Sequence, residues 1–198
     1  MKKTLLIAAL TLAGTAGVFA QVNYGVKAGV NLSNMSLSED VDGWDPGMLT
    51  GFNAGVFVNT EVAENFSIQP ELLYSTAGSV IAEEGDDSWK QKLSYLSLPV
   101  LARYQLVEGL RLEVGPQVGL LLSAKSVVDM GGEEVEDDIK DNTESIDFGL
   151  TGGASYQLPV GVGIFARYYA GLTDLGKEDT GDVTIKNNNI AVGLTYTF

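Results

Sequence analysis

The sequence contains no cysteine and no histidine. Without cysteine it has no disulfide framework, no thiolate metal site and no lipoprotein anchor. Without histidine it lacks the usual general base and a common metal ligand. It also has no G-x-x-x-x-G-K-[ST] motif, which binds phosphates. These absences predict a protein that is not an enzyme and that has no catalytic, cofactor or metal site.

Basic residues and long apolar runs are also scarce. Twelve Lys and Arg residues stand against 26 Asp and Glu residues, for a net charge of −14. No basic patch remains to neutralise phosphates, so nucleic acid is not an expected partner. No run of 18 apolar residues follows the first twenty residues, so no transmembrane helix is expected. Yet a mean hydropathy of +0.11 with 24 Gly and five Pro does not describe a disordered chain.

The first twenty residues have the pattern of a secretory signal peptide. Lys2 and Lys3 form a short basic start, an apolar stretch follows, and Val18-Phe19-Ala20 offers small residues at a cleavage site. Residues 1–20 are therefore predicted to be removed after Ala20. The mature chain, 21–198, would hold 198 − 20 = 178 residues, enough for one domain.

The last nine residues, Ile190–Phe198, predict a β-strand with two unlike faces. Large apolar residues alternate with Ala, Gly and Thr, so the apolar side chains share one face of an extended strand. The same alternation recurs in seven earlier segments, 22–32, 52–59, 66–75, 95–104, 110–123, 148–157 and 162–171. Pro70 interrupts one of them, and a local bulge is expected there because proline cannot donate to a β-ladder.

The connections between these eight segments alternate between long and short. The long ones span 33–49, 78–90, 125–146 and 174–186, and the others are short turns. Outer-membrane barrels have an even number of strands, short periplasmic turns and longer outside loops. The pattern predicts an all-β fold, an eight-stranded antiparallel up-and-down transmembrane β-barrel. Both mature termini would then be periplasmic and the long loops extracellular.

Aromatic residues on the apolar face gather near the strand ends, as in the aromatic girdles at the two interfaces of a membrane. The predicted girdle near the short turns contains Tyr24, Phe66, Tyr104, Tyr156, Tyr196 and Phe198, and the girdle near the long loops contains Phe52, Tyr74 and Phe148.

The opposite face carries charges of both signs among many small polar residues. A barrel of eight strands has an interior only wide enough for side chains, so these charges are expected to form an ion-pair network that fills the lumen. A proton or ion path along them is the alternative interpretation. The candidate members are Lys27, Glu71, Arg103, Arg111, Glu113 and Arg167.

The four long connections are acidic. They hold 20 of the 26 acidic residues against five lysines, with the densest cluster from Glu133 to Asp141. Oxygen ligands of this kind suit Ca²⁺, but the spacing matches no EF-hand, and charge runs are usually solvated surface. Solvated loops are therefore the first interpretation, with divalent cations or bridging to anionic lipid headgroups as alternatives.

Four stretches carry a resemblance to a known family: Tyr24–Ser33, Tyr95–Tyr104, Gly115–Leu122 and the terminal Phe198. With these the chain resembles the small outer-membrane β-barrel proteins of Bacteroidetes, the PorT-like group, whose architecture is similar to OmpX and the OmpA membrane domain. The resemblance implies residence among outer-membrane lipids. It also implies insertion by the barrel-assembly machinery, for which Phe198 would be the signal.

Several functions remain open from the sequence. The first is a stand-alone barrel with a structural role or a role in surface interaction, whose loops contact an envelope or extracellular protein. The second is an accessory of a protein-secretion apparatus, as the PorT resemblance implies. A small porin and a soluble lipocalin-like carrier are weaker alternatives, because the lumen is narrow and the carrier needs an apolar interior.

Overall fold

The computed structural model describes residues 22–37, 46–84, 87–176 and 184–198. The expected signal peptide, 1–20, lies outside the described residues and stays a prediction. Nearly all of the described chain is β-strand. The strands are β1 (Val22–Leu37), β2 (Gly47–Ala63), β3 (Phe66–Glu84), β4 (Asp87–Val107), β5 (Leu110–Met130), β6 (Glu133–Asp138), β7 (Ile146–Gln157), β8 (Val162–Gly171) and β9 (Ile185–Thr197). One 3-10 turn, η1 (Lys140–Asn142), follows β6.

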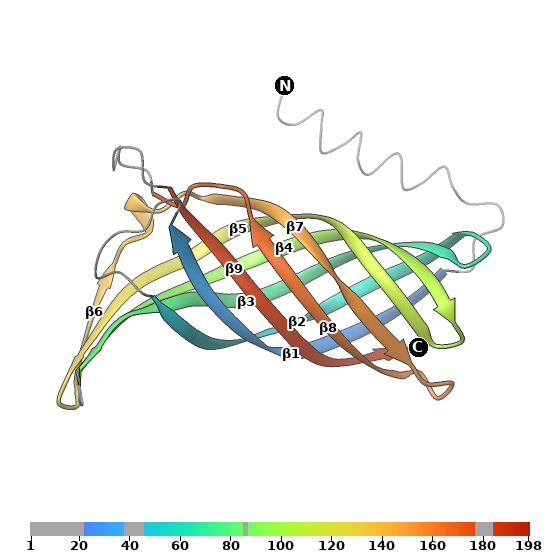
Figure 1. Ribbon diagram of the computed structural model, residues 1–198, viewed down its shortest axis with the longest axis horizontal. Helices are drawn as coiled ribbons and strands as arrows, with labels where there is room; N and C mark the ends of the chain where they lie inside the picture. The colour runs from blue at the N-terminus through green and yellow to red at the C-terminus, as the bar shows by residue number, and fades with distance from the viewer. Residues whose placement is uncertain (1–21, 38–45, 85–86, 177–183) are drawn as a thin grey trace, which may run out of the picture.

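Eight of these strands form a closed antiparallel ring (Figure 1). Neighbours along the chain pair in order, β5 pairs with both β4 and β7, and β1 pairs with β9 to close the ring. The closing register places Ala28 opposite Leu194 and Val30 opposite Val192. The predicted eight-stranded up-and-down barrel is therefore confirmed.

The two faces of each strand differ as the alternation predicts. In β9, residues 190, 192, 194 and 196 are exposed on the outside of the barrel, whereas the residues between them are partly buried. The exposed residues are apolar on nearly every strand, including Val56, Leu98 and Val114. The inward residues are small, polar or charged through most of the barrel. This barrel therefore has an apolar outer wall and a polar filling.

The two ends of the barrel are unlike. At one end, the turn end, residues 64–65, 108–109 and 158–161 join the strands in tight turns. Asn65 and Gly109 have positive φ there, as such turns often need. The other end, the hairpin end, carries β6 and the extended parts of β3, β4 and β5 (Figure 1). The carboxyl terminus lies at the turn end (Figure 1).

The prediction of irregular loops is wrong for much of two of the four long connections. Residues 78–84 continue β3 and residues 87–90 begin β4, and the pairing of these strands runs out to Glu84 opposite Asp87. Residues 125–138 form the β5–β6 hairpin around Gly131 and Gly132, which have φ of 63° and 99°. Pairing with an already formed neighbour holds Glu and Asp in strands despite their low β-propensity. The hairpins extend the sheet beyond the ring.

The bulge expected at Pro70 is also absent. Pro70 lies opposite Val100, and the β3–β4 register does not shift between Phe66 opposite Tyr104 and Leu73 opposite Ser97. The β2–β3 register is likewise the same at Phe57–Glu71 and at Thr60–Ile68. The two strands keep their alignment past a residue that has no N–H to donate.

Within the described ranges, no helix has the length and apolar character needed to cross a bilayer.

The ring should tolerate a disrupted β6 but not a disrupted β9. Val192 lies between Val30 of β1 and Ala166 of β8, so Val192→Pro removes a ladder hydrogen bond where the ring closes. We expect most of this variant to lose the compact form that migrates faster on gels before heating. Asp137→Pro, placed in β6 outside the ring, should keep that form. Equal behaviour of the two variants would contradict the assigned ring.

Candidate functional site in the barrel lumen

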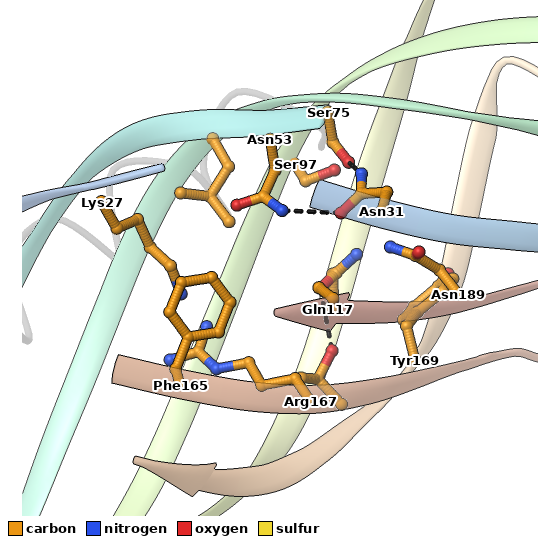
Figure 2. Close-up of a pocket in the computed structure, with 13 residues that line it drawn as sticks. Lys27, Asn31, Asn53, Ser75, Ser97, Gln117, Phe165, Arg167, Tyr169 and Asn189 are labelled. Carbon is orange, nitrogen blue, oxygen red and sulfur yellow. Dashed lines mark hydrogen bonds between the residues drawn. The ribbon is translucent and has the colours of Figure 1, made fainter. Parts of the chain in front are cut away.

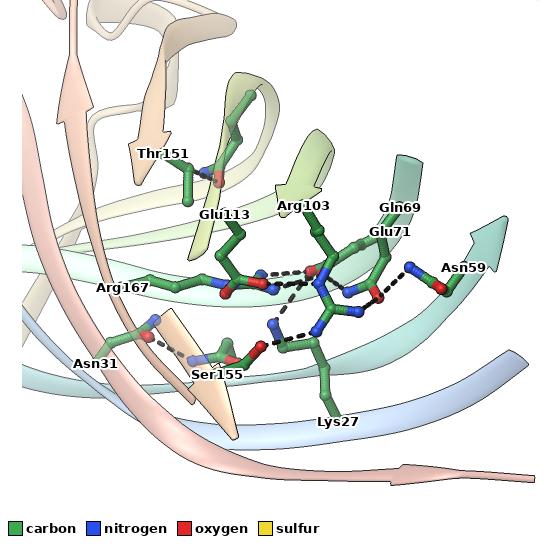
Figure 3. A network of polar contacts seen from close by, with 12 residues as sticks. Lys27, Asn31, Asn59, Gln69, Glu71, Arg103, Glu113, Thr151, Ser155 and Arg167 are labelled. Atoms are coloured by element: carbon green, nitrogen blue, oxygen red, sulfur yellow. Dashed lines mark hydrogen bonds and ion pairs between the residues drawn. The ribbon is translucent and has the colours of Figure 1, made fainter. Parts of the chain in front are cut away.

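Three cations and two carboxylates meet in the lumen (Figure 3). Glu71 on β3 accepts from Lys27 Nζ at 3.1 Å and from both terminal nitrogens of Arg167 at 2.7 and 2.8 Å. Glu113 on β5 also accepts from Arg167 Nε, and its other oxygen lies 3.2 Å from Arg103 Nε. All five side chains are buried. The cluster thus joins five strands across the barrel.

Neutral polar side chains complete this cluster, and the sequence analysis did not single them out. Gln69 donates to Glu71 at 2.7 Å and accepts from Arg103. Arg103 also donates to the Ser155 hydroxyl at 2.7 Å, and Asn59 reaches Gln69 and Ser67. Each of these residues occupies an alternate position on the same inward face as the charged residues. That alternation was the one feature of the sequence from which they could have been predicted. Extra hydrogen bonds are what a buried ion pair needs to offset its desolvation.

Inward glycines provide the space for this filling. A Cβ atom at Gly193 would lie 2.8 Å from the Phe165 ring, and one at Gly29 would lie 2.9 Å from it. The ring of Phe165 in turn lies 3.9 Å from Lys27 Nζ, in cation–π contact. A Cβ atom at Gly153 would lie 3.0 Å from the Arg167 side chain. Backbone carbonyl oxygens of the neighbouring strands lie closer still, so the close approach of the strands and the large central side chains together leave no room for a side chain at these positions.

Arg111 does not join the cluster, although the sequence analysis includes it. It forms no ion pair with any described residue and lines an open cavity of about 500 Å³ at the turn end, together with Glu61 and Arg103. Arg111 follows Leu110 at the start of β5. Its side chain points inward but lies too near the rim of the barrel to reach the central carboxylates.

A small polar chamber lies beside the charged cluster (Figure 2). Its volume is about 30 Å³, room for about two water molecules. Lys27 and Arg167 border it, and the rest of its wall is mostly neutral and polar. Asn31 is fully buried there; it donates to Ser75 at 3.0 Å and accepts from Asn53 at 2.6 Å. Thr151 donates to Gln117 at 2.8 Å.

The lumen becomes apolar at the hairpin end. Buried Met35, Leu93, Leu121 and Leu175 pack there with small and aromatic neighbours, and Ile139 and Ile185 cover them. The polar interior expected from the alternation is therefore wrong for this end. The cause is that Ile139, beside η1, and Leu175, in the chain after β8, pack over the mouth and help to bury apolar side chains there. Such long-range coverage leaves no periodic signal in the sequence.

The aromatic residues chosen from the sequence lie outside the barrel near its ends. Most are more than a third exposed, and Phe66 is partly buried. At the turn end, Phe198 contacts Tyr24 and Tyr196, with ring centres 5.7 and 5.3 Å apart. At the hairpin end, the rings of Phe52 and Tyr74 lie 5.7 Å apart. Tyr104, Tyr156 and Phe148 occupy the remaining outward positions.

The acidic hairpin β5–β6 is solvated. All six residues of β6 are exposed, and no group of three or more acidic side chains among the described residues is arranged to hold a metal ion. Glu136 pairs with Lys125 at 2.5 Å, and Glu134 lies 3.9 Å from Lys92. The hydrogen bond from Lys125 lowers the pKa of the Glu136 carboxyl, and the same bond raises the pKa of Lys125. These contacts hold the hairpin to its neighbours.

Comparison with known proteins identifies the class of this barrel. The family model described as outer membrane protein beta-barrel domain matches residues 19–176. The chain belongs to this family. Membership places the protein in the outer membrane, with the apolar wall of the barrel in lipid.

One solved structure shows the same fold at low identity. Neisserial surface protein A (NspA) is 17% identical, with a TM-score of 0.55, and the match covers 91% of this chain and 100% of that one. Ail, the attachment invasion locus protein of Yersinia pestis, is 16% identical, with a TM-score of 0.48, and the match covers 90% of this chain and 99% of that one. No curated protein sequence matches the chain. These likenesses concern the fold alone.

Loss of a central carboxylate should be costly for this family member. Glu71→Gln leaves Lys27 and Arg167 buried with one carboxylate fewer, and breaking a buried pair costs about 3–5 kcal/mol. We expect the free energy of unfolding, measured by urea titration in phospholipid vesicles, to fall by about that amount. Glu136→Gln breaks only an exposed pair and should leave the free energy of unfolding nearly unchanged. A Glu71→Gln variant as stable as the parent would contradict the assigned role.

Proposed function

We propose that this protein is a closed, non-enzymatic outer-membrane barrel with a structural role and a role in surface interaction. The observation that carries the proposal is the filled lumen. The ion-pair cluster bridges five strands, and the apolar cluster around Leu93 and Leu121 fills the hairpin end. The protein then contributes an outer wall to the membrane and a shaped surface outside it.

The contents of the lumen should block the passage of ions. An ion would have to break the buried pairs of Glu71 and Glu113 and then pass the apolar cluster without its hydration shell. Both steps are costly in a narrow, low-dielectric interior. The same charges are fully occupied in holding the strands together, so structural filling is favoured over a proton or ion path.

The paired carboxylates also argue against catalysis. Glu71 and Glu113 are each held by two cations, which leaves neither of them free to act as a general base. Surface interaction is then the function for which the hairpin end is best suited.

We place the turn end in the periplasm and the hairpin end outside the cell. Short periplasmic turns and long outside loops are the rule for bacterial barrels. The aromatic rings at both ends would anchor in the two interfaces of the membrane. Phe198, packed against Tyr24 and Tyr196 at the turn end, would be the signal for the barrel-assembly machinery.

The outside surface would be acidic. β6 is a solvated edge strand with five acidic residues in six, and it projects beyond the ring. Such a surface disfavours anionic partners and suits an envelope or extracellular protein with a basic face. The PorT-like secretion role stays a prediction, because no contact of the described residues bears on it.

The purified barrel should not conduct. We expect protein reconstituted in planar bilayers to give no steady current under conditions in which an open 16-stranded porin conducts. The physical reason is the buried cluster around Glu71 and the apolar cluster beyond it. Lasting steps of conductance from the parent protein would contradict the closed barrel and favour a small porin.

Epitope labelling of intact cells should reveal the orientation. A peptide tag inserted between Gly131 and Gly132, in the β5–β6 turn, should bind antibody on intact cells. The same tag between Glu64 and Asn65, in the β2–β3 turn, should bind only after the outer membrane is permeabilised. The reverse pattern would contradict the orientation and leave the closed lumen as a separate question.

A further inference from the structure

Asp147 is a buried carboxylate without a cation. It lies near the start of β7 and is 2% exposed, and none of the ion pairs of the described residues includes it. Arg167, two residues before Tyr169 on β8, is already held by Glu71 and Glu113. A buried negative charge is costly unless it is paired. The side chains around Asp147 therefore do not by themselves balance its buried negative charge.

Several buried oxygen atoms in the same part of the barrel have no hydrogen-bond partner. The Tyr95 hydroxyl, Asp147 Oδ1 and the side-chain oxygens of Asn187 and Asn189 are all buried and have no hydrogen-bond partner. Tyr95 and Asn187 are each only 3% exposed. The carboxylate and amide oxygens can only accept, and the Tyr95 hydroxyl can accept as well as donate, so a group that donates hydrogen bonds or carries positive charge would satisfy all four.

Three of these residues lie close together in the lumen. A Cβ atom at Gly119 would lie 3.2 Å from the Tyr95 ring and 3.7 Å from Asp147 Cβ, so these two side chains flank the same glycine. Asn187 donates to Asp147 Oδ2 at 3.3 Å. Asn189 faces the lumen two residues further along β9.

Tyr169 links Asn189 to this group. It lies opposite Asn189 in the β8–β9 register and beside it in the chamber (Figure 2). The Tyr169 side chain also lies against the Asp147 carboxylate. The proposed ligands therefore come from β4, β7 and β9, and Tyr169 connects Asn189, which lines the chamber, to Asp147.

We propose that Tyr95, Asp147, Asn187 and Asn189 form a binding site for a small monovalent cation, sodium or potassium. Oxygen ligands of this type suit hard cations. One carboxylate among neutral oxygens balances one positive charge, whereas a divalent ion would leave an excess. The chamber, of about 30 Å³, can supply water for the remaining coordination.

The bound cation would tie β4, β7 and β9 together across the lumen below the apolar cluster. Because the unfolded chain cannot assemble these oxygens, the cation stabilises only the folded barrel. Above saturation, the ratio of folded to unfolded protein rises in proportion to the cation concentration. The site thus predicts that stability depends on the identity of the salt and not only on its ionic strength.

The test is unfolding of the full mature chain in zwitterionic phospholipid vesicles, which carry no net lipid charge. Sodium chloride or potassium chloride replaces N-methyl-D-glucamine chloride at constant total ionic strength. For the parent protein we expect the folded-to-unfolded ratio to rise about tenfold between 10 and 100 mM of one of the two small cations. Asp147→Asn keeps the shape of the side chain and removes its charge, so this response should vanish.

Two further variants guard against ambiguity. Asp137→Asn removes an exposed acidic charge of β6 and should respond to cations as the parent does. Tyr95→Phe removes one ligand oxygen without changing charge and should shift the response to higher cation concentration, even if Asp147→Asn does not fold. An unchanged response in Tyr95→Phe and Asp147→Asn, or no response in the parent, would overturn the proposal and leave a site completed by water or a proton alone.

Discussion

Closure of the ring by β1 and β9 is the constraint on which the rest of this structure depends. In lipid no water is available to backbone N–H and C=O groups, so every strand needs two partners. The thirteen residue pairs from Gly25–Thr197 to Leu37–Ile185 provide the last of these partnerships. β6, which pairs on one side only, lies beyond the ring, where water can satisfy its free edge. The strand pairing thus already distinguishes the strands that can lie in lipid from the strand that must lie in water.

A ring of eight strands leaves a narrow lumen, and its contents follow from that width. The outward positions must be apolar, so the alternating inward positions hold the polar and charged side chains. Charges in such a space must be paired, which explains why Glu71 and Glu113 each serve two cations and why neutral residues such as Gln69 complete their hydrogen bonds. Beyond them the filling becomes apolar, and Asp147 stands between the two regions.

The sequence predicted the features that have a period of two residues. Strand number and the inward placement of Lys27, Glu71, Arg103, Glu113 and Arg167 follow from this period, whereas the strand order was predicted from the alternation of long and short connections. Features set by contacts between distant segments were missed. The hairpin 125–138 has a Gly131-Gly132 signal typical of tight turns, but its acidic residues favoured a loop. Asp147 was passed over because one carboxylate at the end of a strand has no pattern, and Arg111 was included because parity cannot tell the rim from the centre.

Spin labelling along β9 tests the central claim, an apolar wall in lipid around a polar filling. Because the chain has no cysteine, a single cysteine introduced at each position from 190 to 196 carries the only label. We expect labels at 190, 192, 194 and 196 to collide with oxygen dissolved in the bilayer, and labels at 191, 193 and 195 to be shielded from it. Reversed alternation, or equal access at all seven positions, would contradict the account.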